Sequence, residues 1–147
     1  MIKRHAEAVW RGNLKEGSGT FRFGATEGRY SFASRFGDGE GSTPEELIGA
    51  ASAGCFSMAL SLFLGERGYT PEVIRTTSTV QLDPDKLAIT RIDLDTEAEV
   101  PRLDEGEFQR IAEQAKQNCP VSKALGSVEI VLKSAKLTSA GAGLGRR

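Results

Sequence analysis

The segment TPEELIGAASAGCFSMALSLFLGERG, residues 43–68, is the longest apolar run in the chain and decides how the rest can fold. No charged residue stands between Glu46 and Glu66, and Cys55, one of two cysteines, lies near the middle. As a helix that rises about 1.5 Å per residue, the segment has roughly 28 Å of uncharged length. Water does not stabilise such a surface, so we expect a central helix that other elements cover.

Both ends of this segment carry signals for a helix boundary. Thr43 and Glu46 have the spacing of a capping box, and Pro44 stands at the first helical position. Gly65 and Gly68 are the residue type that ends helices. The sequence therefore predicts one long helix bounded by these residues.

A membrane span has a similar length, but the composition argues against it. The first half of the segment is small and only weakly apolar, and no second segment resembles it. Small residues at positions 49–54 allow another backbone to approach closely, whereas the following positions carry bulk on nearly every side. We expect the core of a sheet-wrapped fold or of a dimer, and no membrane partner.

Three short strands are predicted before this helix. Residues 2–10 and 19–23 flank the turn-rich GNLKEGSG and indicate a β-hairpin. Residues 30–36, YSFASRF, continue with a two-residue alternation, which predicts a third strand that ends at Arg35. The glycine-rich loop GDGEGS then leads into the helix, and its acidic residues argue against a phosphate site.

After the helix the pattern alternates between strand and helix. Residues 73–82 and 88–100 flank DPDK and predict a long hairpin. Residues 104–117 form an amphipathic pattern, and Cys119-Pro120 then opens a short helical turn with Cys119 at the N-cap. Residues 128–137 predict a last strand. The fold class expected is α+β, with antiparallel sheets wrapped around the central helix.

Length, charge and composition limit the remaining possibilities. The 147 residues, 39% of them hydrophobic, suit one domain over residues 1–137, followed by a flexible tail at 138–147. A net charge of −1 and a pI near 5.9 argue against nucleic acid as a partner. The first residues, MIKRHAEAVW, lack the apolar core of a signal peptide, so we expect a cytoplasmic protein.

The two cysteines leave several chemical roles open. Composition alone favours two inert buried thiols, because free cysteine is among the most buried residue types. Metal binding is disfavoured, since His5 is the only histidine and no C-x-x-C occurs. A histidine-assisted hydrolase is disfavoured too, because nothing suggests an orienting partner for His5. A reactive Cys55 in an apolar helix would need a cation, since burial raises the pKa of a thiol.

Two motifs give the chain a family resemblance. TPEELIGAASAGCFSMALS, followed by NCPVSKAL, resembles the paired motif of the OsmC/Ohr family, the osmotically inducible and organic hydroperoxide resistance proteins, and is most similar to the OsmC branch. The similarity extends from about Ala8 to Leu137. It implies an OsmC-like fold and an intertwined homodimer whose two active sites lie at the subunit interface.

The resemblance also implies a role for four residues. Cys55 matches the peroxidatic cysteine of the family and Cys119 the resolving one. Arg35 matches the arginine that holds the peroxidatic thiolate, with Arg29 as the alternative, and Glu45 matches the carboxylate that pairs with that arginine. From the residues alone, Glu45 would be read as an acid at a helix start. Local physics instead favours Cys119, at a helix N-terminus, as the thiol of lower pKa.

The function implied is a thiol-dependent peroxidase that reduces organic hydroperoxides to alcohols and protects against oxidative stress. We expect no metal, flavin or haem, an intramolecular Cys55–Cys119 disulfide in the cycle, and a dithiol reductant, of the lipoyl type among others. The alternative is a dimeric binding protein for small apolar molecules, in which the thiols only pack.

Helix geometry raises one problem for this site. Glu45 stands ten residues before Cys55, which in a straight helix is roughly 15 Å along the axis and some 80° away around it. Either the helix breaks around Gly49 or Gly54, or Arg35 and Glu45 reach the thiol of the other subunit. We expect the second arrangement.

Overall fold

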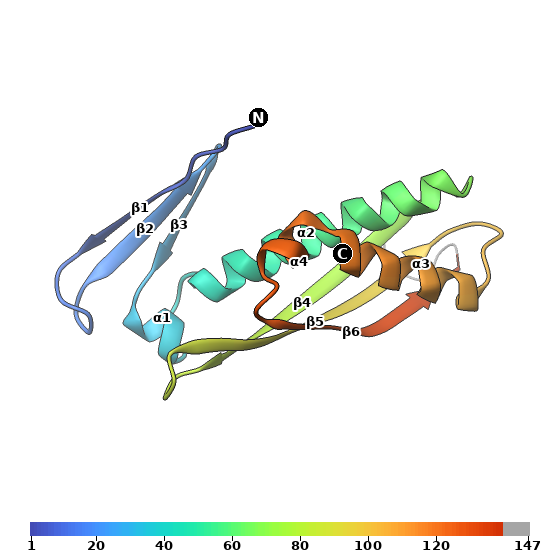
Figure 1. Ribbon diagram of the computed structural model, residues 1–147. Helices are drawn as coiled ribbons and strands as arrows, with labels where there is room; N and C mark the ends of the chain where they lie inside the picture. Colours follow the sequence, from blue (N-terminus) through green and yellow to red (C-terminus); the bar gives the residue numbers. More distant parts are fainter. Residues whose placement is uncertain (140–147) are drawn as a thin grey trace. The chain divides into compact units, whose positions relative to one another are not determined.

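The computed structural model describes residues 1–139, which form two compact units, residues 1–47 and residues 48 onward (Figure 1). The elements in chain order are β1 (Glu7–Arg11), β2 (Ser18–Phe23), β3 (Thr26–Tyr30), α1 (Phe32–Phe36), α2 (Pro44–Glu66), β4 (Val73–Asp83), β5 (Ala88–Glu99), α3 (Glu105–Asn118), α4 (Pro120–Ala124) and β6 (Glu129–Leu137). The single domain over residues 1–137 stays a prediction. Most of the predicted tail, residues 140–147, lies outside the described residues.

The first unit is built on a three-stranded antiparallel sheet in the order β1-β2-β3. The predicted hairpin at its start is confirmed. The third predicted strand is wrong: β3 ends at Tyr30, and the following residues form the short helix α1. Arg35 therefore lies in the last turn of a helix and not at a strand end.

A serine pair explains why α1 is helical. Ser31 is the N-cap, and its hydroxyl accepts from the Ser34 amide at 3.1 Å while the Ser34 hydroxyl accepts from the Ser31 amide at 2.9 Å. These reciprocal bonds form a capping box, with serine in the position where glutamate is usual. The local hydrogen bonds outweigh the two-residue alternation of aromatic side chains on which the strand prediction rested.

The second unit holds a sheet in the order β4-β5-β6. Strands β4 and β5 form the predicted antiparallel hairpin, but β6 pairs with β5 in parallel. The expectation of purely antiparallel sheets is therefore wrong for this sheet. Parallel neighbours need a long crossover, and here α3 and α4 provide it between β5 and β6.

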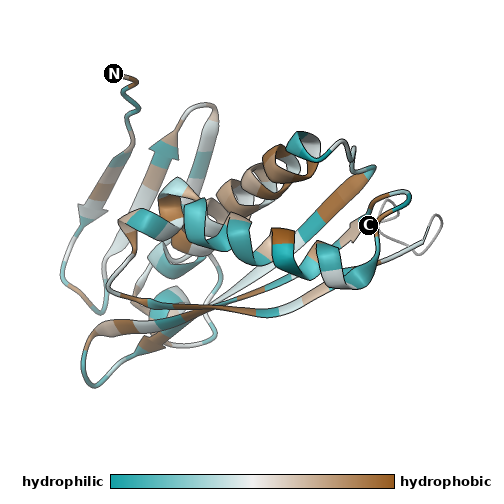
Figure 2. Cartoon of the chain, turned by 45° about the vertical axis from the view of Figure 1, so that its right-hand side comes forward, coloured by the Kyte–Doolittle hydropathy of each residue, from teal (hydrophilic) through white to brown (hydrophobic). Residues whose placement is uncertain are grey.

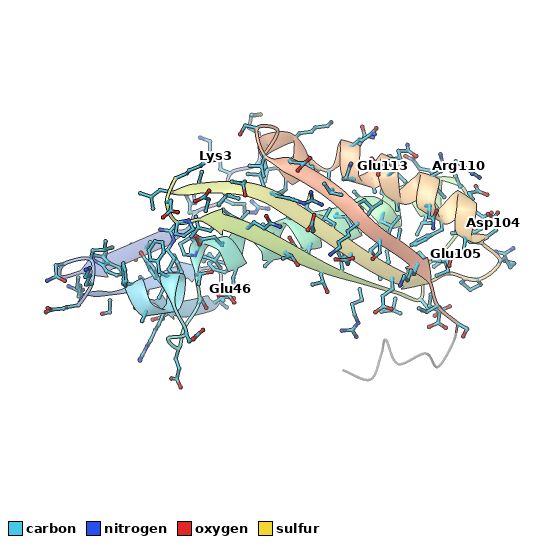
Figure 3. The ribbon with its side chains drawn as sticks, turned by 90° about the horizontal axis from the view of Figure 1, so that it is seen from below. Lys3, Glu46, Asp104, Glu105, Arg110 and Glu113 are labelled. Atoms are coloured by element: carbon cyan, nitrogen blue, oxygen red, sulfur yellow. The ribbon has the colours of Figure 1, made fainter. Side chains whose placement is uncertain are left out.

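Helices α2 and α3 cover one face of this sheet (Figures 1 and 2). Apolar residues of both helices meet those of β5, and the core consists of Phe56, Leu60, Leu64, Ile92, Leu94, Ala98, Val100, Leu103, Phe108, Ile111, Ala112, Ala115 and Ala135. Charged side chains such as Glu105, Arg110 and Glu113 project from α3 (Figure 3). The predicted amphipathic helix is thus confirmed, and Asp104 is its N-cap.

The ends of α2 follow the predicted signals. The Thr43 hydroxyl accepts from the Glu46 amide at 3.0 Å. At the other end the Tyr69 amide donates to the Leu64 carbonyl and the Gly68 amide to the Gly65 carbonyl, each at 3.0 Å, which is the Schellman motif. Between these ends the helix is uninterrupted, so the predicted alternative of a break at Gly49 or Gly54 is wrong.

Within the second unit, the described residues leave apolar side chains of α2 exposed. Met58 is 77% exposed and Leu62 57% exposed, although both lie in an apolar segment. By length and hydropathy α2 could also cross a membrane, a test that the core helix of a soluble protein passes as well. Neighbouring exposed apolar side chains of this kind are typical of a contact surface.

Candidate active site

The structure brings the two cysteines together. Cys55 lies on α2, and Cys119 lies at the junction of α3 and α4, where its amide donates to the Ala115 carbonyl at 3.0 Å. The two thiols are near enough for each to shift the pKa of the other, and both are free rather than disulfide-bonded. Cys119 is fully buried and Cys55 is half-buried. The sequence did not indicate how far apart Cys55 and Cys119 lie, and the fold brings them into contact.

Their surroundings shift the two thiols in opposite directions. Burial raises the pKa of Cys55, and the neighbouring Cys119 raises it further, while the Val121 amide lowers it in part. Burial also acts to raise the pKa of Cys119, but the Cys55 thiol, the amide and hydroxyl of Ser122 and the Val121 amide together lower it below its ordinary value. The Cys119 side chain makes no capping hydrogen bond to α4. Within the chain, Cys119 is the stronger acid, as local physics predicted.

A second charged pair lies in the first unit. The Nε of Arg35 donates to Oε1 of Glu45 at 2.8 Å, and the carboxylate side chain is only 10% exposed. The contact uses a single nitrogen, so it does not have the bidentate form that a guanidinium can adopt with a carboxylate. Glu45 Oε2 is buried without a partner in the described chain. The predicted pairing of Arg35 with Glu45 is therefore present, and Arg29 lies elsewhere, exposed on β3.

Two features of the site were missed in the sequence. One is Ser122, whose signal was its place three residues after the N-cap Cys119. The other is an apolar hollow of about 260 Å³ beside Arg35, which we call the aromatic hollow. Its walls include Trp10, Leu14, Tyr30, Phe32, Arg35 and Phe36. The strand prediction for residues 30–36 hid this feature, because only the turn into α1 gathers these rings.

The donor atoms of the described chain do not suggest a metal centre. Among residues 1–139, no group of three or more histidine, cysteine, aspartate or glutamate side chains is placed to hold an ion. The two clusters themselves offer the chemistry of thiols and of an arginine–carboxylate pair.

Comparison with known sequences gives a consistent result. Residues 37–133 match the family of OsmC-like proteins. The chain is 46% identical over 136 residues to the peroxiredoxin OsmC of Escherichia coli, covering 89% of this chain and 94% of that protein. It is 35% identical over 102 residues to an organic hydroperoxide resistance protein-like 1 of Staphylococcus saprophyticus, covering 65% and 70%. The family match contains all of α2, so this helix belongs to the shared fold and is not a membrane span.

Solved structures show the same fold. An OsmC-like protein from Mycoplasma pneumoniae superposes with a TM-score of 0.72 at 18% identity and covers 93% of this chain and 99% of its own. The organic hydroperoxide resistance protein OhrB of Bacillus subtilis superposes with a TM-score of 0.60 at 24% identity, over 91% and 98%.

Proposed function

The chain belongs to the family of OsmC-like proteins, and from this membership and its paired thiols we propose that it is a peroxidase that reduces organic hydroperoxides to alcohols. The observation that carries the proposal is the contact between Cys55 and Cys119. Two thiols that meet in the folded chain can form a disulfide without a large rearrangement. Inert packing thiols have no need of such a contact.

The reaction divides into three balanced steps. The Cys55 thiolate attacks the distal oxygen of the hydroperoxide, the O–O bond breaks, and the alkoxide leaves and takes up a proton as the alcohol. The resulting sulfenic acid on Cys55 condenses with the Cys119 thiol, forming a disulfide and releasing water. An external dithiol then reduces this disulfide by exchange and is itself oxidised. We expect a lipoyl-type dithiol among the reductants.

Arg35 and Glu45 serve the first step in this proposal. Burial disfavours the Cys55 thiolate, and a guanidinium beside it would offset that effect and stabilise the departing alkoxide. Glu45 holds Arg35 through Nε, which leaves the terminal nitrogens of the guanidinium for the thiolate and the peroxide.

We further propose a homodimer that shares its sites. The uncovered apolar side of α2, with Met58 and Leu62, supports a second copy of the chain as its cover. An uninterrupted α2 separates Glu45 from Cys55 along the helix, which supports the arrangement in which Arg35 and Glu45 act on the thiol of the other subunit. A cytoplasmic location, where a reductant keeps thiols reduced, suits this cycle.

Thiol counting tests the proposed function. We expect one equivalent of cumene hydroperoxide to be consumed by the reduced protein with loss of two free thiols per chain. Cys55→Ser abolishes consumption, whereas Cys119→Ser keeps the first turnover but leaves Cys55 open to overoxidation, seen by mass spectrometry as sulfinic acid. Two thiols retained in the presence of peroxide would support the alternative of a binding protein, and equal loss of the first turnover in both variants would reverse the roles of the cysteines.

A further inference from the structure

The two thiols differ in how far an external molecule can reach them. Cys119 is fully buried, whereas Cys55 is partly exposed. Cys55 lies on α2 at helical spacing from Ala51 and Met58, and both of these residues are exposed. The sulfur of Cys55 is therefore the more accessible of the two in the described chain.

Hydrogen bonds on both sides hold Cys119 in its buried position. Its amide donates to the Ala115 carbonyl, and its carbonyl accepts from the Lys123 amide, each at 3.0 Å. Ala115 is itself fully buried on α3. Exposure of the Cys119 sulfur would thus require the junction of α3 and α4 to open, whereas Cys55 needs no such rearrangement.

The direction of attack at Cys55 gives a second argument, which rests on the proposed function. Displacement at a divalent sulfur is in line, so the entering and leaving atoms lie on opposite sides of the sulfur. When Cys119 attacks the sulfenic acid, the oxygen departs on the side away from Cys119, which is the side from which the hydroperoxide came. A thiol that enters by the same route then meets the bond between the two cysteines end on, at the sulfur of Cys55.

We propose that the external dithiol attacks the Cys55 sulfur of the disulfide and that Cys119 is the leaving group. A sulfur of the dithiol bonds to Cys55, the bond between the two cysteines breaks, and its electron pair stays on Cys119 as a thiolate, which then takes up a proton. The second sulfur of the dithiol displaces Cys55 from the mixed disulfide and closes the oxidised dithiol. Hydroperoxide and reductant thus share one opening and one reacting atom.

Ser122 is placed to assist the departure of Cys119. It stands three residues after the N-cap Cys119, and its buried hydroxyl has no oxygen or nitrogen partner among the described residues. The hydroxyl and amide of Ser122 lower the pKa of Cys119, and a thiol of lower pKa leaves faster. Burial instead raises the pKa of Cys55, so the same rule disfavours Cys55 as the leaving group.

Mapping of a mixed disulfide tests the proposal on the wild-type protein. Diamide forms the disulfide without peroxide, and excess 2-mercaptoethanol then attacks it. Because this monothiol cannot close a ring, the mixed disulfide persists long enough to be trapped with acid. The freed thiol is labelled with N-ethylmaleimide after denaturation, and trypsin separates the cysteines into residues 36–67 and residues 117–123. At the earliest times we expect 2-mercaptoethanol on Cys55 and the maleimide on Cys119.

The possible maps separate this inference from the proposed function. 2-Mercaptoethanol on Cys119, or equally on both cysteines at the earliest times, overturns the proposal and leaves the peroxidase function intact. Failure of diamide to join the two cysteines overturns it as well, because no disulfide would then be available to the reductant. The expected map in a protein that consumes no hydroperoxide contradicts the proposed function and supports the direction of disulfide reduction.

Substitution of Ser122 tests its part in this step. We expect Ser122→Ala to slow reduction of the disulfide by 2-mercaptoethanol about threefold, because Cys119 becomes a poorer leaving group. The Cys119 transition should also move to higher pH. Ser127→Ala, at an exposed serine after α4, is the matched control and should change neither value. An unchanged rate in Ser122→Ala, or a slower rate without a shift of the Cys119 transition, contradicts this role of Ser122.

Discussion

Cys55 and Cys119 lie near each other, yet their surroundings shift their pKa values in opposite directions. Burial acts to raise the pKa of both thiols. The first amides of α4 and Ser122 more than offset this effect at Cys119, whereas at Cys55 the Val121 amide offsets only part of it. The thiol expected to attack first is therefore the one whose thiolate the chain itself stabilises less. A cation that acts on Cys55 resolves this conflict, and Arg35 is the cation we propose.

This leads to a prediction for the pH dependence of the two thiols. In reduced protein with 13C-labelled cysteine, we expect Arg35→Ala to move the Cys55 transition to higher pH, because removal of a positive charge disfavours the thiolate. Cys119 should still titrate below its ordinary value of 9.0, because its stabilising groups are unaffected. The two transitions belong to the coupled pair, so both resonances are followed together by NMR.

Arg29→Ala serves as the control for this titration. It should leave the Cys55 transition where it is in the wild type. A shift in Arg29→Ala without one in Arg35→Ala would show that the wrong arginine was chosen.

The sequence predicted the identity of these residues better than their environment. The expected ion pair between Arg35 and Glu45 is present, whereas the catalytic roles of Cys55, Cys119, Arg35 and Glu45 stay predictions. The influence of Ser122 on Cys119 was not expected, because a serine after Cys-Pro is also an ordinary surface residue of a short helix.

At the scale of elements, the ends of helices that have local hydrogen-bonding signals could be predicted. A segment that carried both a strand pattern and a helix signal could not. Both ends of α2 follow from residues within one turn of the boundary. Residues 30–36 carried two signals at once, an alternation of aromatics and the pair Ser31 and Ser34. The alternation only indicates which side chains would be buried if the segment were a strand. The serine pair forms hydrogen bonds with backbone amides, and these bonds make the segment helical.

Two glycines at the end of α2 allow a matched stability test. Neither has an atom within 4 Å of an added Cβ, but Gly68 has a φ of +85° and Gly65 is helical. We expect Gly68→Ala to lower the free energy of unfolding by about 1 kcal/mol, because left-handed backbone strains any other residue. Gly65→Ala should raise it by about 0.5–1 kcal/mol, because alanine favours the helix.

Urea unfolding monitored by circular dichroism measures both values. Equal effects of the two substitutions would show that Gly68 does not form the Schellman motif in solution.

At the scale of the whole molecule, pairing between distant segments was the least predictable feature. The alternating pattern of residues 128–137 predicts which side chains face inward. It does not predict which strand this segment pairs with, or whether the pairing is parallel or antiparallel. The parallel pairing of β6 with β5 depends on how α3 and α4 pack against the sheet, and that packing is a property of the folded chain.

Mixed dimers test whether subunits share their sites. An inactive Cys55→Ser chain and an inactive chain with Arg35→Ala and Glu45→Ala are combined and allowed to exchange subunits. If the charged pair of one subunit serves the thiol of the other, heterodimers recover one working site of two, about half the wild-type activity per dimer. The measurement is the rate of peroxide consumption, made after subunit exchange has been verified.

The control for this experiment adds Met58→Glu to both chains. Met58 lies on the uncovered side of α2, and a charge there should prevent pairing and abolish the recovery. Failure to recover activity despite exchange would place all of the groups of one site in a single chain.

The crossover between β5 and β6 also sets the order in which the thiols can meet during synthesis. Cys119 lies inside the crossover, and its position depends on β6, which closes the sheet at residues 129–137. A nascent chain emerges from its N-terminus, so Cys55 leaves the ribosome long before β6 does. A chain that ends just before Glu129 would therefore carry both cysteines but lack the strand that closes the sheet, which makes the thiol contact a late product of folding and a marker of chains that have finished it.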